Sequence, residues 1–453
     1  MIKWIKFLLC AGAVFVGIAL LIWVLNTRDE EDIKTPQAQA PWVPSDTMVQ
    51  RGAYLARAGN CMTCHTARGS EAYAGGRGID TPFGTVYTSN LTPDEKTGIG
   101  SWSPAHFWRA MHNGRSKSGR LLYPAFPYAN YTLVTRDDSD ALLAYLKSLR
   151  PIEKANRPNA LRFAYQSQAA LAVWRAMYFR PGVYKPDASK PAEWNRGAYL
   201  VNGLGHCSAC HTSRNALGAT TGPDLAGGRI PIQNWYAPSL VSPHEAGVGV
   251  GEGARQDLVN LLKNGVSSHA AVNGPMTEVV LGSTQYLSTE DLHAMALFVQ
   301  ELPAASALAT STSTSTQPAQ SALSIMATAP STQVRTAPVD IKGAKLYEKH
   351  CAQCHGEQGK GQQTGAFNAY PALAGNRAVL MGQTVNLVQI ILNGGYAPAT
   401  SGNPRPFGMP PFVLVLDDSE VAAILTHIRG TWGNQASAVT ALEVNRIRSN
   451  QAR

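Results

Sequence analysis

The sequence lacks the signatures of the common enzyme classes. It contains no nucleotide-binding fingerprint, no Ser-His-Asp order and no metalloprotease motif. Cysteine is also scarce, with seven in 453 residues. Six of the seven belong to the repeated motif described next, so no disulfide framework remains. These absences leave that motif as the main source of chemistry in the chain.

The pattern C-x-x-C-H occurs three times, as Cys61-Met62-Thr63-Cys64-His65, Cys207-Ser208-Ala209-Cys210-His211 and Cys351-Ala352-Gln353-Cys354-His355. It is the attachment signature of c-type haem: two thiols add across the haem vinyl groups, and the adjoining imidazole faces the iron. A redox dithiol or half of a zinc site would not need a histidine after the second cysteine each time. We therefore expect three covalently bound haem c groups, with the six cysteines as attachment points and His65, His211 and His355 as iron ligands.

An apolar segment lies near the amino terminus. Phe7 to Leu25 contains no charge, and at about 1.5 Å per residue it can cross a hydrocarbon core of roughly 30 Å. Lys3 and Lys6 precede it and an acidic cluster at 29–32 follows it. This charge asymmetry predicts a cytoplasmic amino end and an exported remainder.

The apolar segment could be a cleaved signal or a permanent anchor. The sequence Ala38-Gln39-Ala40 resembles a cleavage site, but Pro41 follows it directly and the apolar run is distant. We expect residues 1–27 to be a retained transmembrane anchor. The haem domains are then expected on the periplasmic side of a bacterial inner membrane.

The net charge of +9 does not predict nucleic-acid binding. Each haem brings about two ionisable propionates, so three haems would offset most of the surplus. We expect an inner-membrane protein with no nucleic-acid partner.

An internal repeat precedes the haem motifs: Arg51-Gly52-Ala53-Tyr54-Leu55, Arg196-Gly197-Ala198-Tyr199-Leu200 and, more loosely, Gly343-Ala344-Lys345-Leu346-Tyr347. Amphipathic helices are predicted at the other end of each repeat, over Asp138 to Leu149, Thr289 to Leu302 and Asp417 to Arg429. This pattern predicts a mainly α protein with three tandem class I cytochrome c domains. The expected order is an anchor at 1–27, domain 1 at 45–150, an aromatic-rich connecting strap at 151–193, domain 2 at 194–302, a Ser/Thr/Ala/Pro-rich linker at 303–339, domain 3 at 340–433 and a tail at 434–453.

Class I domains normally supply a second iron ligand from a methionine in the loop before the last helix. Met276 and Met409 lie in such loops, next to proline and glycine, and are the expected ligands in domains 2 and 3. Domain 1 has no methionine in this loop. Its candidates are His106, His112 and Met111, the last more consistent with a core position. Haem 1 is thus ligated unusually, ligated from another segment or subunit, or five-coordinate.

Nearly the whole chain, from about Met48 to Gly433, resembles the three-haem cytochrome c subunit of membrane-bound dehydrogenase complexes that oxidise alcohols, aldehydes, gluconate or fructose. The resemblance rests on Tyr87-Thr88-Ser89-Asn90-Leu91-Thr92-Pro93, on Leu122-Tyr123-Pro124-Ala125-Phe126-Pro127-Tyr128, on Trp194 to Val201 and on Pro406-Phe407-Gly408-Met409-Pro410-Pro411. Phe126 stands where many relatives have methionine.

The resemblance implies a partner with the catalytic cofactor. This partner is a dehydrogenase subunit of molybdopterin, PQQ or flavin type, with or without a small third subunit, and this chain passes its electrons to ubiquinone. The chain itself would then be non-catalytic. The alternative is a haem enzyme of peroxidase type, for which only domain 1 could offer an open iron with His106 or His112 nearby.

Overall fold

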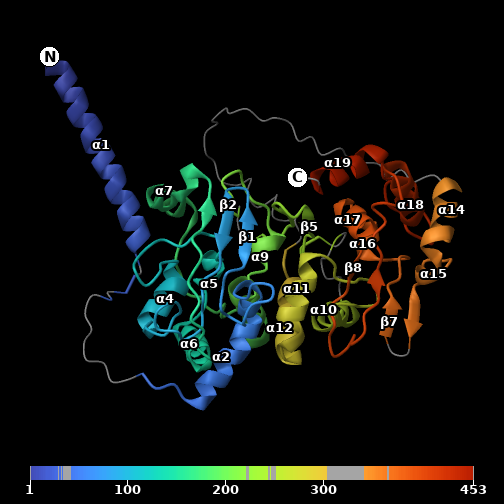
Figure 1. Ribbon diagram of the computed structural model, residues 1–453, viewed down its shortest axis with the longest axis horizontal. Helices are drawn as coiled ribbons and strands as arrows, with labels where there is room; N and C mark the ends of the chain where they lie inside the picture. The colour runs from blue at the N-terminus through green and yellow to red at the C-terminus, as the bar shows by residue number, and fades with distance from the viewer. Residues whose placement is uncertain are drawn as a thin grey trace. The chain divides into compact units, whose positions relative to one another are not determined.

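The computed structural model describes residues 2–28, 30–31, 33, 42–220, 224–242, 245, 251–303, 341–364 and 367–451. The described chain is mainly helical and divides into two compact units (Figure 1). Unit 1 comprises residues 1–190, 198–209 and 216–219, and unit 2 comprises residues 191–197, 210–215 and 220–453. The cleavage-like sequence at 38–40 and residues 304–339 of the expected linker lie outside the described residues.

Unit 1 begins with a long apolar helix and continues with short helices and a small sheet. Its elements are α1 (Ile2–Thr27), α2 (Asp46–Ala58), α3 (Cys61–Cys64), β1 (Gly78–Thr81), β2 (Gly84–Tyr87), α4 (Pro104–Asn113), α5 (Tyr128–Tyr131), α6 (Arg136–Ser148), β3 (Ala160–Leu161), η1 (Phe163–Gln166) and α7 (Gln168–Tyr178). The three strands pair antiparallel, with β2 in the middle. Helix α1 is long and apolar enough to cross a membrane. A signal sequence near the amino terminus has the same length and composition.

The residues around the second haem motif are divided between the two units. This stretch contains helix α8 (Ala192–Tyr199), the π-helix η2 (Leu200–Leu204) and helix α9 (Ser208–His211). The remaining elements belong to unit 2: β4 (Gly228–Ile230), β5 (Trp235–Ala237), α10 (Glu252–Asn264), α11 (Pro275–Gly282), η3 (Thr284–Tyr286), α12 (Thr289–Gln300), α14 (Ile341–His350), α15 (Ala352–His355), β6 (Gln362–Thr364), β7 (Phe367–Tyr370), α16 (Arg377–Leu380), α17 (Val385–Asn393), β8 (Gly395–Tyr396), β9 (Gly408–Met409), α18 (Asp418–Gly430) and α19 (Ala441–Gln451). The strands form antiparallel hairpins, β4 with β5, β6 with β7 and β8 with β9. The sequence analysis predicted none of these hairpins.

The glycine of each internal repeat marks a helix crossing. A Cβ on Gly52, Gly197 or Gly343 would lie 1.8, 1.9 or 2.2 Å from the carbonyl oxygen of Ala141, Ala294 or Ala423, respectively. Each of these alanines lies in the last helix of its repeat, α6, α12 or α18. Only glycine allows the backbones to approach so closely. The repeated glycine therefore specifies how the first helix of each repeat packs on the last.

The residue before each glycine reinforces the same crossing. It contacts a polar side chain near the start of the last helix, and the pairs are Arg51–Asp138 at 2.6 Å, Arg196–Asp291 at 2.7 Å and, as a hydrogen bond, Lys342–Ser419 at 3.1 Å. The third contact joins a cation to a neutral hydroxyl. This matches the looser third copy of the repeat in the sequence.

The last helices begin with side-chain caps. Ser288 accepts from the backbone of α12, and Asp417 forms a reciprocal capping box at the start of α18. The sequence offers Ser288 or Thr289 as the cap of α12, and the structure uses Ser288. Helix α6 is capped by Thr135, so it begins two residues before the expected start.

A buried arginine organises the core of the third repeat. Arg429 is fully buried on α18 and donates to the carbonyl oxygens of Val379, Met381 and Ser437, at 2.5, 2.8 and 2.7 Å. These carbonyls belong to segments on either side of α18 in sequence. Because buried carbonyls need donors, Arg429 joins α16 and the chain after α18 to one core.

Candidate haem sites

The histidine of each C-x-x-C-H motif is held by a backbone carbonyl. Nδ1 of His65, His211 and His355 lies 2.7, 2.6 and 2.9 Å from the carbonyl oxygen of Ser89, Pro238 and Pro371, respectively. A carbonyl oxygen only accepts, so Nδ1 carries the proton and the lone pair is on Nε2. Such a second hydrogen bond is what orients a histidine that ligates a metal.

Burial keeps these three imidazoles neutral. It lowers the pKa of His65, of His211 and of His355, and the carbonyl hydrogen bond opposes this effect less strongly. Each ring therefore presents an unprotonated Nε2 at neutral pH, as iron ligation requires.

The three carbonyl partners were not identified from the sequence. They share one signal: Ser89, Pro238 and Pro371 are each followed two positions later by leucine, at Leu91, Leu240 and Leu373. The amide of each leucine donates to the backbone of another segment. The hydrogen bond from the leucine amide fixes the segment that carries the histidine's carbonyl partner. The acceptors of these amides lie too far away in sequence for a local pattern to reveal them.

The paired thiols do not have the properties of a redox dithiol. Burial raises the pKa of Cys61 to about 12 and that of Cys351 to about 11, with a smaller contribution from the second cysteine of each motif. Burial also raises the pKa of Cys210. Thioredoxin-like cysteines require the opposite shift, toward a stable thiolate. The arrangement therefore disfavours dithiol exchange.

Met276 lies in the first turn of α11 and is partly buried. The turn before it is fixed by Gly274, which has φ +55° and packs against Trp235 so closely that a Cβ would lie 2.6 Å from the indole ring. No L side chain fits that space without a shift. The loop that carries Met276 is thus held in place by an aromatic side chain.

Met409 lies in β9, where it pairs with Gly395 of β8. Met409 and Cys351 pack against the same hydrophobic core. The structure therefore brings the proposed sixth ligand and a haem-attachment cysteine of the third repeat to one core.

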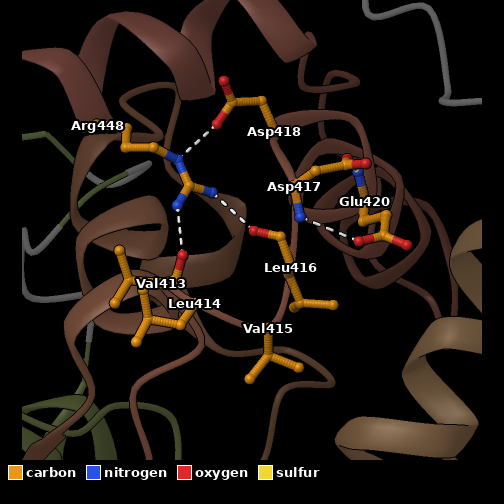
Figure 2. Close-up of a pocket in the computed structure, with 8 residues that line it drawn as sticks. All are labelled: Val413, Leu414, Val415, Leu416, Asp417, Asp418, Glu420 and Arg448. Atoms are coloured by element: carbon orange, nitrogen blue, oxygen red, sulfur yellow. Dashed lines mark hydrogen bonds and ion pairs between the residues drawn. The ribbon is translucent and has the colours of Figure 1, made fainter.

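The C-terminal helix secures the segment that follows Met409 (Figure 2). Arg448 of α19 donates to the carbonyl oxygens of Val413 and Leu416, both at 2.8 Å, and forms an ion pair with Asp418 at 2.7 Å. These groups line a shallow depression of about 460 Å³ between α19 and the start of α18. The sequence identifies residues 434–453 only as a tail, and the structure shows that helix α19 within it forms this clamp.

The first site has aromatic residues where the others have methionine. Phe126, in the loop before α5, packs on Tyr131 with the ring centroids 5.2 Å apart. Tyr131 is buried beside Cys61 and Cys64, and its hydroxyl donates to the carbonyl oxygen of Gly59 at 3.1 Å. Tyr131 also lies edge-on to His206, at 5.7 Å between centroids. These aromatic rings line the Cys61–Cys64 region.

The other candidate ligands of the first site all lie on α4. Met111 is buried in α4, consistent with a core role. His112 is buried, its Nδ1 lies 2.9 Å from the carbonyl oxygen of Thr132, and its ring stacks on Trp108. His106 forms a capping box with Ser103 at the start of α4.

The residues present fit covalent haem at each motif. The two thiols, an oriented neutral imidazole and a buried apolar surface are the groups that haem c requires. The described residues contain no cluster of three or more His, Cys, Asp or Glu side chains suited to a metal ion. Nδ1 of His269 lies 2.6 Å from a carboxylate oxygen of Asp257, within hydrogen-bond distance.

Comparison with known proteins agrees with this geometry. The cytochrome c family model matches residues 49–150 and 341–432. The cytochrome c subunit of quinone-dependent alcohol dehydrogenase from Gluconacetobacter polyoxogenes is 36% identical over 92% of this chain and 87% of the relative. The cytochrome c subunit of gluconate 2-dehydrogenase from Pantoea cypripedii is 37% identical over 96% and 95%, respectively. The fructose dehydrogenase cytochrome subunit of Gluconobacter japonicus is 33% identical over 95% and 87%. This chain belongs to the family of cytochrome c subunits of membrane-bound, quinone-linked dehydrogenases.

Membership in this cytochrome c subunit family confirms the resemblance predicted from the motifs. The subunit is an electron-transfer component of a multi-subunit dehydrogenase complex, and its cytochrome c domains bind haem covalently. The middle repeat lies outside the ranges of the family model, but the similarity to the relatives extends over it.

Proposed function

We propose that this cytochrome c subunit carries three covalent haem c groups and passes electrons from the catalytic subunit of a periplasmic dehydrogenase, acting on an alcohol or an aldehyde, to ubiquinone. One observation supports three equivalent sites: the histidine of each motif, His65, His211 or His355, forms the same hydrogen bond to a backbone carbonyl. The haem iron, when bound, supplies reversible one-electron chemistry. The catalytic partner would hold a molybdopterin, PQQ or flavin cofactor.

The chain's own residues prepare these sites in distinct ways. The cysteine pairs attach each group covalently. His65, His211 and His355 present Nε2, and Met276 and Met409 supply a soft second ligand that favours the reduced state. Phe126 and Tyr131 give the first site an apolar wall in place of such a ligand. We infer that haem 1 is ligated unusually, is ligated from another segment or subunit, or is five-coordinate.

We infer that α1 is retained as an anchor, because its carboxyl end is built into unit 1. Asn26 is 7% exposed, donates to the carbonyl oxygen of Ala172 at 2.9 Å and accepts from Nε of Arg175 at 3.0 Å. Arg115 donates to the carbonyl oxygen of Asn26 at 3.2 Å and pairs with Glu30 at 3.3 Å. Cleavage after this segment would leave buried Arg175 without its amide partner, which is costly. The haem domains would then lie on the periplasmic face of the inner membrane.

Intact mass spectrometry of the purified holoprotein tests the number of haems. The mass should exceed that of the polypeptide by three haems, and a denatured haemochrome spectrum should report c-type haem in the same ratio. Haem that acid acetone extracts, or two haems per chain, would contradict the proposal.

The partner and the electron acceptor are tested in membranes. A tagged chain solubilised in detergent should copurify with a dehydrogenase subunit, and the complex should reduce ubiquinone when substrate is added. Replacing residues 2–21 by a cleavable export signal, which keeps Asn26 and its bonds to unit 1, should abolish ubiquinone reduction in membranes but leave haem reduction by the partner. A complex whose haems are not reduced by substrate would refute the proposed direction of flow.

A further inference from the structure

Helix α7 presents apolar side chains and no charge to its surroundings. Leu171 and Arg175 face the core, whereas Val173 and Met177, one turn apart on the opposite face, are 42% and 50% exposed. Arg175 is the one charged residue of α7, and it is 2% exposed. A surface helix in water normally carries polar and charged residues on its outer face, so this face is unusual for a soluble domain.

The segment before α7 extends the same surface. Phe163 and Tyr165 in η1 are 93% and 42% exposed, and Tyr178 at the end of α7 is 38% exposed. Together with Val173 and Met177 these residues form what we call the α7 patch. Two exposed arginines flank it, Arg162 and Arg180. Aromatic and apolar side chains with flanking cations are typical of segments at the membrane interface.

The position of α1 relates this patch to the expected membrane. Helix α7 packs beside the carboxyl end of α1 (Figure 1), and Asn26 binds α7 through Ala172. Ile22 is the first residue of α1 that is partly buried. The apolar run of α1 extends three residues further, to Leu25. At 1.5 Å per residue, the contact begins roughly 4.5 Å inside the end of the apolar run. If α1 spans the bilayer, α7 therefore lies at the depth of the lipid headgroups.

We propose that the α7 patch is a second, interfacial membrane attachment. Phe163, Val173 and Met177 enter the boundary between headgroups and acyl chains, and Arg162 and Arg180 contact lipid phosphates. The lipid of the outer leaflet is the occupant because the patch is continuous with the anchor helix. This attachment would fix the tilt of domain 1 on the membrane, and it rests on the proposed retention of α1.

Photo-crosslinking in lipid nanodiscs tests the proposal with the full-length holoprotein. A benzoylphenylalanine is placed, in separate variants, at Phe163, Met177, Phe15 and Lys96. Phe15 lies in α1 and is 74% exposed, so it reports insertion of the anchor; Lys96 is an exposed loop position of unit 1, with a side chain 75% exposed. After irradiation, tryptic peptides are examined by mass spectrometry for phospholipid adducts, and the haem spectrum checks folding.

We expect lipid adducts at positions 163, 177 and 15 and at least tenfold less at 96. Adducts at 15 without adducts at 163 and 177 would overturn the interfacial attachment but leave the anchor intact. Absence of adducts at 15 would refute the anchor itself, and with it the basis of this inference. In native membranes, crosslinks from 163 and 177 to the catalytic subunit instead of lipid would assign the α7 patch to a protein interface and overturn the lipid proposal.

Discussion

Replacing Gly197 by alanine should disrupt the helix crossing of the second repeat. The new Cβ would lie 1.9 Å from the carbonyl oxygen of Ala294, whereas ordinary contact begins at 3.4 Å. Helices α8 and α12 must therefore separate by about 1.5 Å, and a gap of that size removes most of the dispersion energy between facing atoms. The shift also disturbs the Arg196–Asp291 ion pair, which spans the same crossing. Because overpacking typically costs 1–3 kcal/mol and sometimes more, we expect a loss of about 3 kcal/mol.

Urea unfolding of the holoprotein in detergent measures this loss, followed by circular dichroism and haem absorbance. With a slope of about 1–3 kcal/mol per molar urea, the midpoint of the affected transition should fall by roughly 1 M or more. Gly253→Ala is the matched control. Gly253 lies in α10, and a methyl group on its Cα would meet no atom within 4 Å, so alanine there should be neutral or stabilise by up to about 1 kcal/mol. Equal midpoints for Gly197→Ala and the wild type, or an equal loss in both variants, would refute the close-packing argument.

Further changes probe the third repeat and the first site. Arg429→Met should lower the stability of the third repeat by about 3 kcal/mol or more, because three buried carbonyls lose their donor; calorimetry should show the loss, and an unchanged transition would contradict the role of Arg429. Asp417 has its pKa lowered below 3.8, first by the backbone amide of Glu420, so its contribution to stability is present above that pH and is lost as the pH falls through the lowered pKa. Asp417→Asn keeps the cap without the charge, so its unfolding midpoint should change less than that of the wild type between pH 5 and pH 2, and equal slopes would exclude this linkage. Met409→Leu should remove one methionine-to-iron charge-transfer band and lower one midpoint potential while the haem stays attached. Phe126→Met should add such a band and raise the potential of haem 1, and no spectral change there would indicate that another group already ligates that iron.

The sequence predicted the parts of the site that depend on local spacing. The C-x-x-C-H motifs, the methionine loops and the terminal helices are short patterns whose meaning does not require distant contacts. The carbonyl partners of the histidines could not be predicted in this way, because 16 to 27 residues separate each from its histidine. The repeated glycine was visible as a pattern, but its role at the helix crossing depends on a carbonyl about 90 residues away in the first two repeats.

The aromatic strap shows the same limit. Within unit 1, the indole of Trp174 donates to the carbonyl oxygen of Leu217 at 2.9 Å, and the ring of Tyr184 lies 5.6 Å from that of Tyr199 between centroids. The exposed face of α7 was not predicted, because hydrophobicity alone does not distinguish a side chain that meets protein from one that meets lipid or solvent. The contact between α1 and α7, which the structure shows, is the observation on which the proposed lipid contact of this face rests.

The clamp formed by Arg448 has a consequence for biogenesis. Arg448 follows all three haem motifs and the whole of α18 in the sequence, so the ribosome makes it after every group that the third haem needs for attachment. The bonds from Arg448 hold the segment after Met409 and do not involve Cys351 or Cys354. A chain truncated before α19 should therefore acquire its third haem but hold the Met409 loop loosely. Such a product would pass a test for haem content and still have a defective third redox centre, and an affinity tag that displaces α19 would produce the same fault.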